Sequence, residues 1–486
     1  MDKKKTQEGW VEDLTHDGRG VVKKDHYPIF VAGAFPGEKI RSQLVKEGKK
    51  FATGTCLDIL KVSPHRIEKK NPDLDPIMPL QGLAYEEQKA FKENLVRQAF
   101  KRIGGFKDFD LLPILGAENP WAYRNKMTLA VEEVQGQLEF GIYQKNTHNF
   151  IPIEKTYLAE NPLDEAVFKV RDLLRKHKIS AYEAASKRGD LHHLVLKRGH
   201  YQGELMVIFV TRKDKTLGSK DLYQDLAQAL PDLKSLVQNV QEKVHQEILG
   251  KKTRILWGKD QIVDQMLGLD FIQSPQSFYQ VNTPQAERLY EKALAWADLK
   301  GEELALDAYC GLGTLSLNLA KKAKKVYAMD IVKESILAAK GNQDRNQIAN
   351  VHFEAGKAET ILPKWENQGL HFDLALVDPP RKGLDPRFIQ SLLEIAPGKI
   401  VYVSCNPATL TRDCKILGEG GYRLEKVQPV DMFPQTPHVE TVALLSKLDV
   451  DEHIKIEIGE EELDEVEFSK KETDEEIKEY IYKKYG

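Results

Sequence analysis

Cysteine is scarce in this chain, whose 486 residues contain four: Cys56, Cys310, Cys405 and Cys414. No two of them form a Cys-x-x-Cys pair, which argues against a disulfide framework and for a reducing compartment. Long apolar runs are also missing, because no stretch approaches the roughly 20 residues that a membrane span needs. The N-terminal residues Met1–Lys5 lack the apolar segment of a secretory signal. We therefore expect a cytoplasmic protein that does not contact a membrane.

A large excess of either charge is absent, since the formal net charge is −3. The charge is unevenly spread, however. Residues 447–486 carry 15 acidic and 7 basic side chains, a net of −8, which leaves +5 for residues 1–446. We interpret 447–486 as an acidic tail that is either flexible or loosely docked. The mildly basic body permits a polyanionic partner without requiring one, and its lysine clusters are either phosphate contacts or solvated surface.

The length predicts two to four domains. Residues 1–62 alternate apolar with polar or Gly positions between turns, which predicts a small β-barrel of the OB type. Residues 63–255 contain an irregular connector, a helix at Tyr85–Ile103 and a mixture of strands and helices, which predicts an α+β central domain. Residues 256–446 alternate strand and helix patterns, as expected of a parallel, doubly wound Rossmann-like sheet.

Two features of the central part stay open at this point. In the helix at 85–103, Phe91, Leu95, Ala99 and Phe100 fall on one face. The cluster Trp121–Lys126 could stack on RNA and pair with it, or it could combine a core Trp with a surface Arg.

A glycine loop follows the apolar strand that ends in Asp307-Ala308-Tyr309-Cys310. Gly311 and Gly313 let the backbone approach a nucleotide without a Cβ clash. The next strand ends at Asp330, where a carboxylate can hold ribose hydroxyls. This pattern indicates a nucleotide site but does not separate dinucleotides from S-adenosylmethionine, and a tight structural turn remains the alternative.

A second strand ends in Asp378-Pro379-Pro380-Arg381. The two prolines fix the backbone and so hold Asp378 where a cofactor and a substrate would meet. This loop resembles the Asp/Asn-Pro-Pro loop of S-adenosylmethionine methyltransferases. Enzymes that methylate amino groups carry an aromatic residue after the prolines. Arg381 at this position therefore argues against an exocyclic nitrogen as the methylated atom.

A third strand ends in Ser404-Cys405-Asn406-Pro407, and Glu440 precedes a further apolar run. A thiolate that adds to C6 of a uracil activates C5 for methylation, and a base must then remove the C5 proton. Cys405 fits the nucleophile and Glu440 the base, with no metal needed. A buried inert thiol is the usual alternative, and we prefer it for Cys310 and Cys414.

With these motifs the chain resembles the RNA 5-methyluridine methyltransferase family. The similarity extends from residue 1 to Ser446, and its N-terminal part resembles the RNA-binding TRAM domain. The resemblance implies that Cys405 is the nucleophile and Glu440 the proton acceptor. It also implies that S-adenosylmethionine is held by Gln280, Tyr309, Asp330 and Asp378. The motifs that carry it appear in the family's order: Ser-Pro-x-Ser-Phe-x-Gln-x-Asn from Ser274, Asp-x-x-Cys-Gly-x-Gly from Asp307, Asp-Pro-Pro-Arg-x-Gly, Ser-Cys-Asn-Pro and His-Val-Glu-Thr.

The chain departs from the family pattern in two respects. Asp330 stands where members usually have Glu, and the shorter carboxylate should keep the ribose contact. Many members bind an iron–sulfur cluster through four cysteines, but Asp75 and Met78 align with two of those positions and Thr156 lies near the fourth. Because such clusters need thiolates, we expect none here, and we expect ordinary packing to hold the connector.

We therefore expect a monomeric enzyme that methylates C5 of a uridine flipped out of RNA, with 23S ribosomal RNA preferred as substrate. Transfer RNA is the alternative, but bacterial members that act on its T-loop often lack the TRAM domain. A non-catalytic RNA-binding assembly factor is a third hypothesis, which the intact Cys/Glu/Asp set opposes. A cytosine C5-methyltransferase is a fourth, which the absence of paired catalytic cysteines opposes.

Overall fold

The computed structural model describes residues 5–144, 147, 149–243 and 247–448, which form two compact units. The smaller unit holds the described residues up to Glu68, together with Pro79–Ala84 and Leu448. The larger unit holds Lys69–Met78 and Tyr85–Lys447. From residue 449 onward, the predicted acidic tail lies outside the described residues. None of the helices described here combines the length and apolar character of a membrane span.

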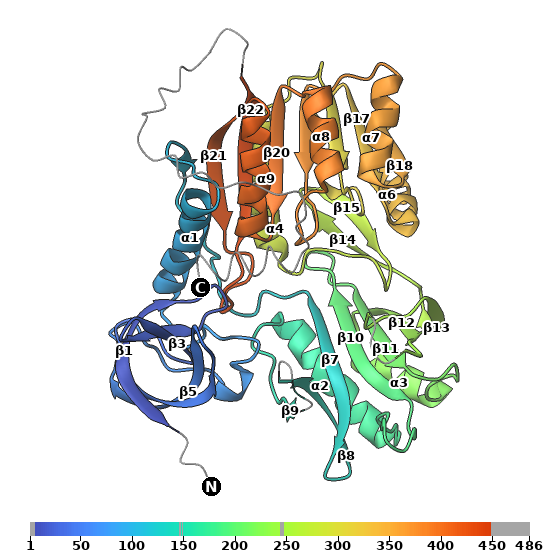
Figure 1. Ribbon diagram of the computed structural model, residues 1–486. Helices are drawn as coiled ribbons and strands as arrows, with labels where there is room; N and C mark the ends of the chain where they lie inside the picture. Colours follow the sequence, from blue (N-terminus) through green and yellow to red (C-terminus); the bar gives the residue numbers. More distant parts are fainter. Residues whose placement is uncertain (1–4, 145–146, 148, 244–246, 449–486) are drawn as a thin grey trace. The chain divides into compact units, whose positions relative to one another are not determined.

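The smaller unit contains a closed five-stranded barrel, as predicted, with strand order β1-β2-β3-β5-β4 (Figure 1). Its strands are β1 (Thr6–Leu14), β2 (Gly20–Lys24), β3 (Tyr27–Ala32), β4 (Lys39–Glu47) and β5 (Ala52–Lys61). Alternate residues point inward to form a small apolar core that includes Val22, Val31 and Ile40. Gly20 is required where strands crowd, because a Cβ there would lie 2.7 Å from the Ala34 carbonyl oxygen.

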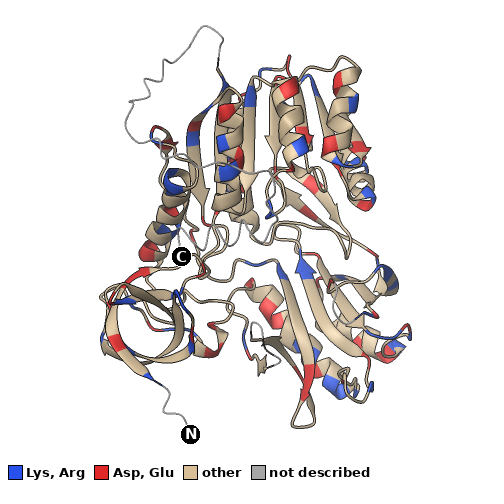
Figure 2. Ribbon diagram, viewed as in Figure 1, with Lys and Arg blue, Asp and Glu red and all other residues tan. Residues whose placement is uncertain are grey.

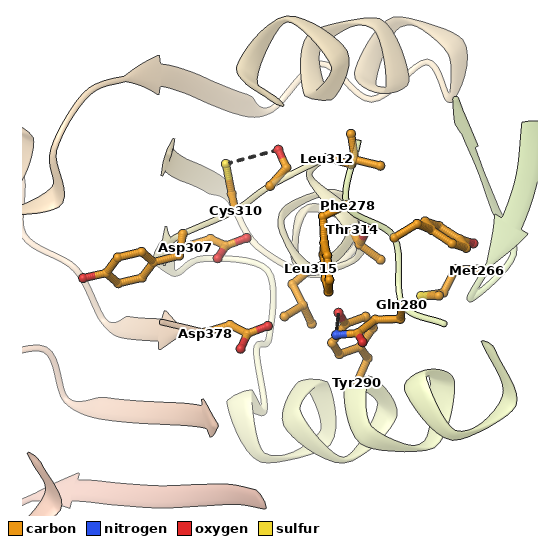
Figure 3. Close-up of a pocket in the computed structure, with 13 residues that line it drawn as sticks. Met266, Phe278, Gln280, Tyr290, Asp307, Cys310, Leu312, Thr314, Leu315 and Asp378 are labelled. Carbon is orange, nitrogen blue, oxygen red and sulfur yellow. Dashed lines mark hydrogen bonds between the residues drawn. The ribbon is translucent and has the colours of Figure 1, made fainter. Parts of the chain in front are cut away.

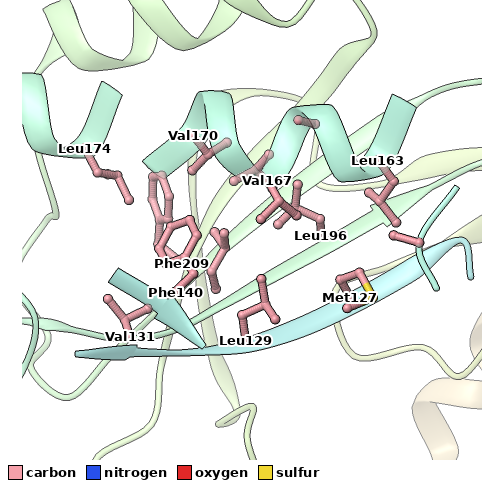
Figure 4. Packing of buried hydrophobic residues seen from close by; sticks show 14 of the residues in the cluster. Met127, Leu129, Val131, Phe140, Leu163, Val167, Val170, Leu174, Leu196 and Phe209 are labelled. Atoms are coloured by element: carbon pink, nitrogen blue, oxygen red, sulfur yellow. The ribbon is translucent and has the colours of Figure 1, made fainter. Parts of the chain in front are cut away.

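The larger unit begins with a seven-stranded sheet of order β13-β12-β11-β10-β7-β8-β9. Helices α2 (Asn161–Lys176) and α3 (Lys220–Ala229) pack on it and bury Leu163, Val167, Val170 and Leu174 against the strands (Figure 4). This sheet and its helices form the α+β arrangement that the pattern predicts. The strands are β7 (Lys126–Val134), β8 (Gln137–Tyr143), β9 (Phe150–Pro152), β10 (Leu191–Arg198), β11 (Leu205–Thr211), β12 (Leu233–Val240) and β13 (Lys252–Gly258).

An eight-stranded sheet of order β18-β17-β16-β19-β20-β22-β21-β6 follows, and its first five strands are parallel. The prediction of a doubly wound sheet is confirmed, with an antiparallel β22 beside β20. A hairpin of β14 (Ile262–Met266) and β15 (Leu269–Gln273) precedes it. The strands of the sheet are β6 (Asp110–Leu111), β16 (Leu304–Ala308), β17 (Lys325–Asp330), β18 (Val351–Ala355), β19 (Leu374–Val377), β20 (Lys399–Ser404), β21 (Tyr422–Val430) and β22 (Glu440–Lys447).

Helices cover both faces of this sheet. One face packs against α4 (Thr283–Ala297), α5 (Thr314–Ala320) and α6 (Lys333–Arg345). The other packs against α1 (Tyr85–Arg102), α7 (Ala358–Asn367), α8 (Pro386–Ile395) and α9 (Pro407–Glu419). The carboxyl ends of the parallel strands therefore meet at one edge, which is where such folds place their ligands.

The helix predicted at 85–103 is α1, which ends at Arg102, and its apolar face is not its most buried one. Phe100 is buried, whereas Phe91, Leu95 and Ala99 are only half-buried. The buried stripe consists of Gln88, Lys92, Val96 and Phe100. Two of these four side chains are polar, so apolar periodicity does not reveal the stripe.

Candidate active site

A pocket opens at the carboxyl end of β16 (Figure 3). Gln280, Tyr309, Gly311 and Asp378, all predicted from the sequence, contribute to its wall. The wall also includes Met266, Phe278, Tyr279, Tyr290, Asp307, Cys310, Leu312, Thr314 and Leu315. In Figure 3 the side chains of Asp307 and Asp378 both point toward Leu315.

The glycine loop is built as its motif predicts. Gly311 has φ of 54°, and an added Cβ there would meet no protein atom within 4 Å, so the residue faces open space. Gly313 has φ of 82° and caps α5, and a Cβ there would press on Phe353 at 3.0 Å. Tyr309 adopts φ of 69°, a left-handed conformation that costs a non-glycine residue about 1–2 kcal/mol. The turn therefore tolerates strain beside the pocket.

Asp330 supports this loop instead of lining the pocket. Its carboxylate accepts hydrogen bonds from the backbone amides of Gly311 at 3.0 Å and Val332 at 2.8 Å. The acidic residue at the end of β17 thus fixes the position of the glycine turn. The ribose contact expected of Asp330 stays a prediction.

The Gln280 loop is held from the neighbouring sheet. Lys197 of β10 donates from Nζ to the carbonyls of Ser274 and Ser277 at 2.9 and 2.8 Å. Asn125 donates from Nδ2 to the Gln280 carbonyl at 2.9 Å, and Gln280 donates from Nε2 to the Tyr290 hydroxyl at 3.2 Å. The side chain of Phe278 in this loop stays 73% exposed, which is unusual for an aromatic ring at a pocket.

Buried carboxyl groups give the pocket its electrostatic character. Burial raises the pKa of Asp307 to about 7, against a 2.5 Å hydrogen bond that its carboxylate accepts from Ser316. Burial also raises the pKa of Asp378 to about 7. A cationic ligand would favour the ionised form of both groups and would offset this cost. Two carboxyls, apolar walls and the open face of Gly311 therefore fit S-adenosylmethionine, which carries a sulfonium and an adenosine.

Cys405 and Glu440 stand at the ends of neighbouring antiparallel strands. Ser404, the last residue of β20, pairs with Thr441 of β22. Cys405 follows Ser404 and Glu440 precedes Thr441, so both residues lie at the same end of this strand pair. Cys405 is half-buried, and Glu440 is 6% exposed.

The sequence after Cys405 makes a sharp strand-to-helix turn. Asn406 caps α9 by accepting a hydrogen bond from Ala408 N at 3.1 Å, and Pro407 occupies the first helical position. Asn406 also donates from Nδ2 to the Arg381 carbonyl at 3.1 Å. The Cys405 turn is therefore joined to the loop that carries Asp378.

The charges of these loops act on one another. Burial raises the pKa of Cys405 to about 11, and the carboxylates of Glu440 and Asp378 push it further up. Burial raises the pKa of Glu440 to about 8, with Asp378 acting in the same direction. Arg381 lowers both values. Cys405, Glu440 and Asp378 therefore lie close enough for their charges to shift the pKa values of Cys405 and Glu440.

The other cysteines near the site differ from Cys405. Cys310 lines the pocket but is 8% exposed, and Cys414 is fully buried. Burial raises the pKa of both thiols well above the usual range. This environment agrees with the inert role predicted for both.

Of the 13 residues that line the pocket, nine were not predicted as site residues, and Asp307, Phe278 and Tyr290 are among them. Asp307 and Phe278 stand inside recognisable motifs, so the signal was present for them. Tyr290 lies in the middle of α4 among apolar positions, and nothing in the sequence distinguishes it from a core aromatic.

Comparisons with known proteins point in one direction. The model of the tRNA (uracil-5-)-methyltransferase family matches residues 122–448. A relative from Enterococcus faecalis, named an uncharacterized RNA methyltransferase, is 44% identical over 437 residues, which are 90% of this chain and 96% of the relative. A relative of the same name from Lactiplantibacillus plantarum is 44% identical over 440 residues, again 90% of this chain and 96% of the relative.

A solved structure is similar over most of the chain. It is the crystal structure of Pyrococcus abyssi tRNA (uracil-54, C5)-methyltransferase in complex with S-adenosyl-L-homocysteine. The match has a TM-score of 0.73 and 29% identity, and it covers 90% of this chain and 100% of the other.

Proposed function

We propose that this protein, a member of the tRNA (uracil-5-)-methyltransferase family, methylates C5 of a specific uridine through Cys405 and Glu440. It is an RNA methyltransferase that uses S-adenosylmethionine. The observation that supports the proposal is that the half-buried Cys405 thiol and the buried Glu440 carboxyl lie just beyond the last pair of β20 and β22, and that Glu440 and Asp378 both act on the pKa of Cys405.

The chemistry needs a nucleophile and a base. Cys405, as a thiolate, adds to C6 of the uracil, and the ring electrons move toward C5 and O4. S-adenosylmethionine, which Gln280, Tyr309, Asp330 and Asp378 would hold, would supply an electrophilic methyl group to C5, with S-adenosylhomocysteine as the leaving group. Glu440 then removes the proton from the methylated C5, the C5–C6 double bond re-forms, and Cys405 leaves as a thiolate.

The raised pKa values bear on this scheme. Once ionised, a carboxylate whose acid has a pKa near 8 is a stronger base than an ordinary glutamate, which suits removal of a carbon-bound proton. The thiol of Cys405 must also lose its proton, and Arg381 favours its ionised form. The exposed ring of Phe278 at the pocket is available to stack on a flipped base.

The parts of the chain receive roles that follow from this chemistry. We assign residues 1–62 as a TRAM-type RNA-binding barrel, 63–255 as a connector and RNA-binding central domain, and 256–446 as the methyltransferase domain. In this scheme a cytoplasmic monomer grips RNA with the first two parts and presents one uridine to the third.

We propose 23S ribosomal RNA as the substrate because the chain carries the N-terminal barrel. Transfer RNA is the second candidate, and the match to a tRNA (uracil-54, C5)-methyltransferase favours it.

One experiment tests both the chemistry and the substrate. The full-length protein is incubated with tritiated S-adenosylmethionine and either 23S ribosomal RNA or transfer RNA from cells that lack it, and methylated uridines are mapped. We expect 5-methyluridine in one of the two RNAs. Cys405→Ala should lose all activity, and Glu440→Gln should accumulate a covalent RNA–protein adduct that survives denaturation.

The adduct is the decisive readout, because a structural defect in Glu440→Gln would lower activity without trapping RNA. Full turnover by Cys405→Ala would refute the nucleophile. Methyl groups found on a base other than uridine would refute the substrate class.

A further inference from the structure

Three cationic side chains gather where the central sheet meets the Gln280 loop: Arg124, Lys126 and Lys197. Arg124 precedes β7, Lys126 begins it, and Lys197 lies near the end of β10. In Figure 2 the blue that marks Lys and Arg colours the ribbon at the adjoining ends of β7 and β10. Arg124 and Lys126 are half-buried, and Lys197 is 3% exposed.

The cluster holds like charges against one another. Lys126 and Lys197 are direct cross-strand partners, an arrangement that destabilises a sheet when both residues carry the same charge. Burial and the charge of Arg124 lower the pKa of Lys126. Burial and the charge of Lys126 lower the pKa of Lys197 far more. The ammonium of Lys197 is at least satisfied by the carbonyls of Ser274 and Ser277.

Arg124 and Lys126 have no acidic counterpart in the part of the chain that the structure describes. Glu160 lies beside Arg124, because its backbone amide donates a hydrogen bond to the Arg124 carbonyl at 3.0 Å. That carboxylate already accepts from His200 at 2.5 Å and pairs with Arg198 at 3.6 Å. Within the described residues the positive charge of Arg124 and Lys126 is therefore left without a carboxylate partner.

The pair is fixed to the active site by the residue between its members. Asn125 donates from Nδ2 to the Gln280 carbonyl and to Thr283 Oγ1, both at 2.9 Å, and its backbone amide donates to the Val281 carbonyl at 2.8 Å. Neither Arg124 nor Lys126 lines the pocket itself. An anion held by this pair would thus lie next to the pocket and outside it.

We propose that Arg124 and Lys126 form a phosphate-binding site for the RNA backbone next to the target nucleotide. The inference rests on the proposed function, because it takes the nucleotide in the pocket to be part of an RNA. A base that enters the pocket keeps its covalent link to the chain, so at least one backbone phosphate must pass close to the rim. Unneutralised cations beside the pocket supply the charge that such a phosphate needs.

The test measures how the affinity for RNA depends on salt. The dissociation constant of the full-length protein with S-adenosylhomocysteine and whichever transcript it binds, 23S ribosomal RNA or transfer RNA, is determined across a range of salt concentrations. Each lost phosphate contact lowers the slope of log K against log salt by about 0.7–0.9, which is about a 5- to 8-fold loss of affinity near 0.1 M salt. We expect this change for Lys126→Met and about twice the change in slope for Arg124→Met/Lys126→Met.

The controls separate binding from folding. Lys169→Met removes an exposed lysine of α2 in the same domain and should leave the slope unchanged. Lys126→Arg should restore most of the slope. Because removal of Lys126 relieves like-charge repulsion, the melting temperature of Lys126→Met should stay equal or rise, whereas loss of a structural residue would lower it.

Three outcomes would overturn the proposal. The first is a salt slope for the double variant equal to that of Lys169→Met. The second is a lower melting temperature that accounts for the weaker binding. The third is weaker binding of S-adenosylhomocysteine with unchanged RNA affinity, which would assign the cations to the cofactor carboxylate. The salt slope is read from binding alone, so it decides this proposal even if the methylated position proves not to be uridine C5.

Discussion

Three acidic side chains near the pocket keep their protons at a pH where most carboxyls have lost them. Burial raises the pKa of Asp307 and Asp378 to about 7 and that of Glu440 to about 8. An arrangement of this kind costs stability whenever the groups ionise without a cation nearby. In a site that fits a sulfonium ligand, these buried carboxyls therefore lower the stability of the ligand-free protein and favour binding of the cation.

For Asp378 the effect on the free energy of unfolding can be measured as a function of pH. Its pKa is raised from 3.8 to about 7 in the folded protein, so between these values the folded state binds more protons than the unfolded state. The free energy of unfolding must then fall as the pH rises through that range. Asp378→Asn removes the titration, and we expect it to be more stable than the parent by about 2–4 kcal/mol near pH 8 and by little near pH 4.

Urea unfolding of both proteins at the two pH values checks this expectation. Asp344→Asn is the matched control, because Asp344 is exposed on α6 and its substitution should leave the pH dependence unchanged. An Asp378→Asn variant that is equally or less stable than the parent near pH 8 would contradict the argument.

Much of the site could be read from single residues of the sequence. Glycines, a proline pair and a strand-end cysteine act through backbone geometry, which local sequence controls, so Gly311, Asp378 and Cys405 were identified without a structure. Tyr290 could not be, because a residue becomes part of a pocket only when α4 is packed against β20 and β22. The charges of Arg124 and Lys126 could not be identified either, since their lack of a carboxylate partner among the described residues is a property of the folded surroundings.

At the scale of elements, α1 shows where periodicity fails. Its period was correct and its bounds nearly so, but its buried stripe contains Gln88 and Lys92. Lys92 donates from Nζ to Asp431 at 2.5 Å and to the Phe433 carbonyl at 3.0 Å, and Gln88 hydrogen-bonds Gln435. Both partners lie more than 300 residues away in sequence. Apolar patterning alone cannot detect polar residues that are buried for such partners.

The Lys92–Asp431 pair should be costly to break. Both side chains are fully buried, and Asp431 also accepts a hydrogen bond from the Tyr85 hydroxyl at 2.9 Å. Lys92→Met leaves an unpaired buried carboxylate, so we expect a loss of about 3–5 kcal/mol in the free energy of unfolding. The segment after Asp431 leads into Glu440, so methylation should fall as well.

A double-mutant cycle with Asp431→Asn provides the measurement, since the double variant should recover much of the loss. Arg97→Met is the control on the same helix. It breaks a partly exposed pair with Glu93 and should cost less than about 1 kcal/mol. A loss for Lys92→Met as small as that of Arg97→Met would show that the buried pair does not stabilise the docking of α1.

At the scale of the whole molecule, the order of parts was predictable because each class of sheet has its own sequence period. A small barrel, a mixed sheet and a doubly wound sheet follow one another along the chain. The connector between the first two was not predictable. Its Lys69–Met78 segment belongs to the larger unit, whereas Pro79–Ala84 belongs to the smaller one.

The connector is held by packing at the positions where relatives with an iron–sulfur cluster would carry cysteines. Met78 is fully buried and joins Leu74 in the core of the central domain, and Asp75 pairs with Lys69. Thr156 donates from its backbone amide and its hydroxyl to Asp164 at 2.8 and 2.6 Å. Within the described residues no group of three or more His, Cys, Asp or Glu side chains is arranged to hold a metal.

If side-chain packing holds the connector, the free energy of unfolding should depend on the side-chain volume at Met78 and not on iron. Met78→Ala leaves a cavity in a buried core and should lower the free energy of unfolding by about 2–5 kcal/mol. Met78→Leu nearly conserves the volume and should cost less than about 1.5 kcal/mol. Urea unfolding measures both, and the parent protein should unfold at the same urea concentration with or without an iron chelator. Stoichiometric iron in the purified protein, or a chelator that lowers its stability, would mean that a metal holds this region after all.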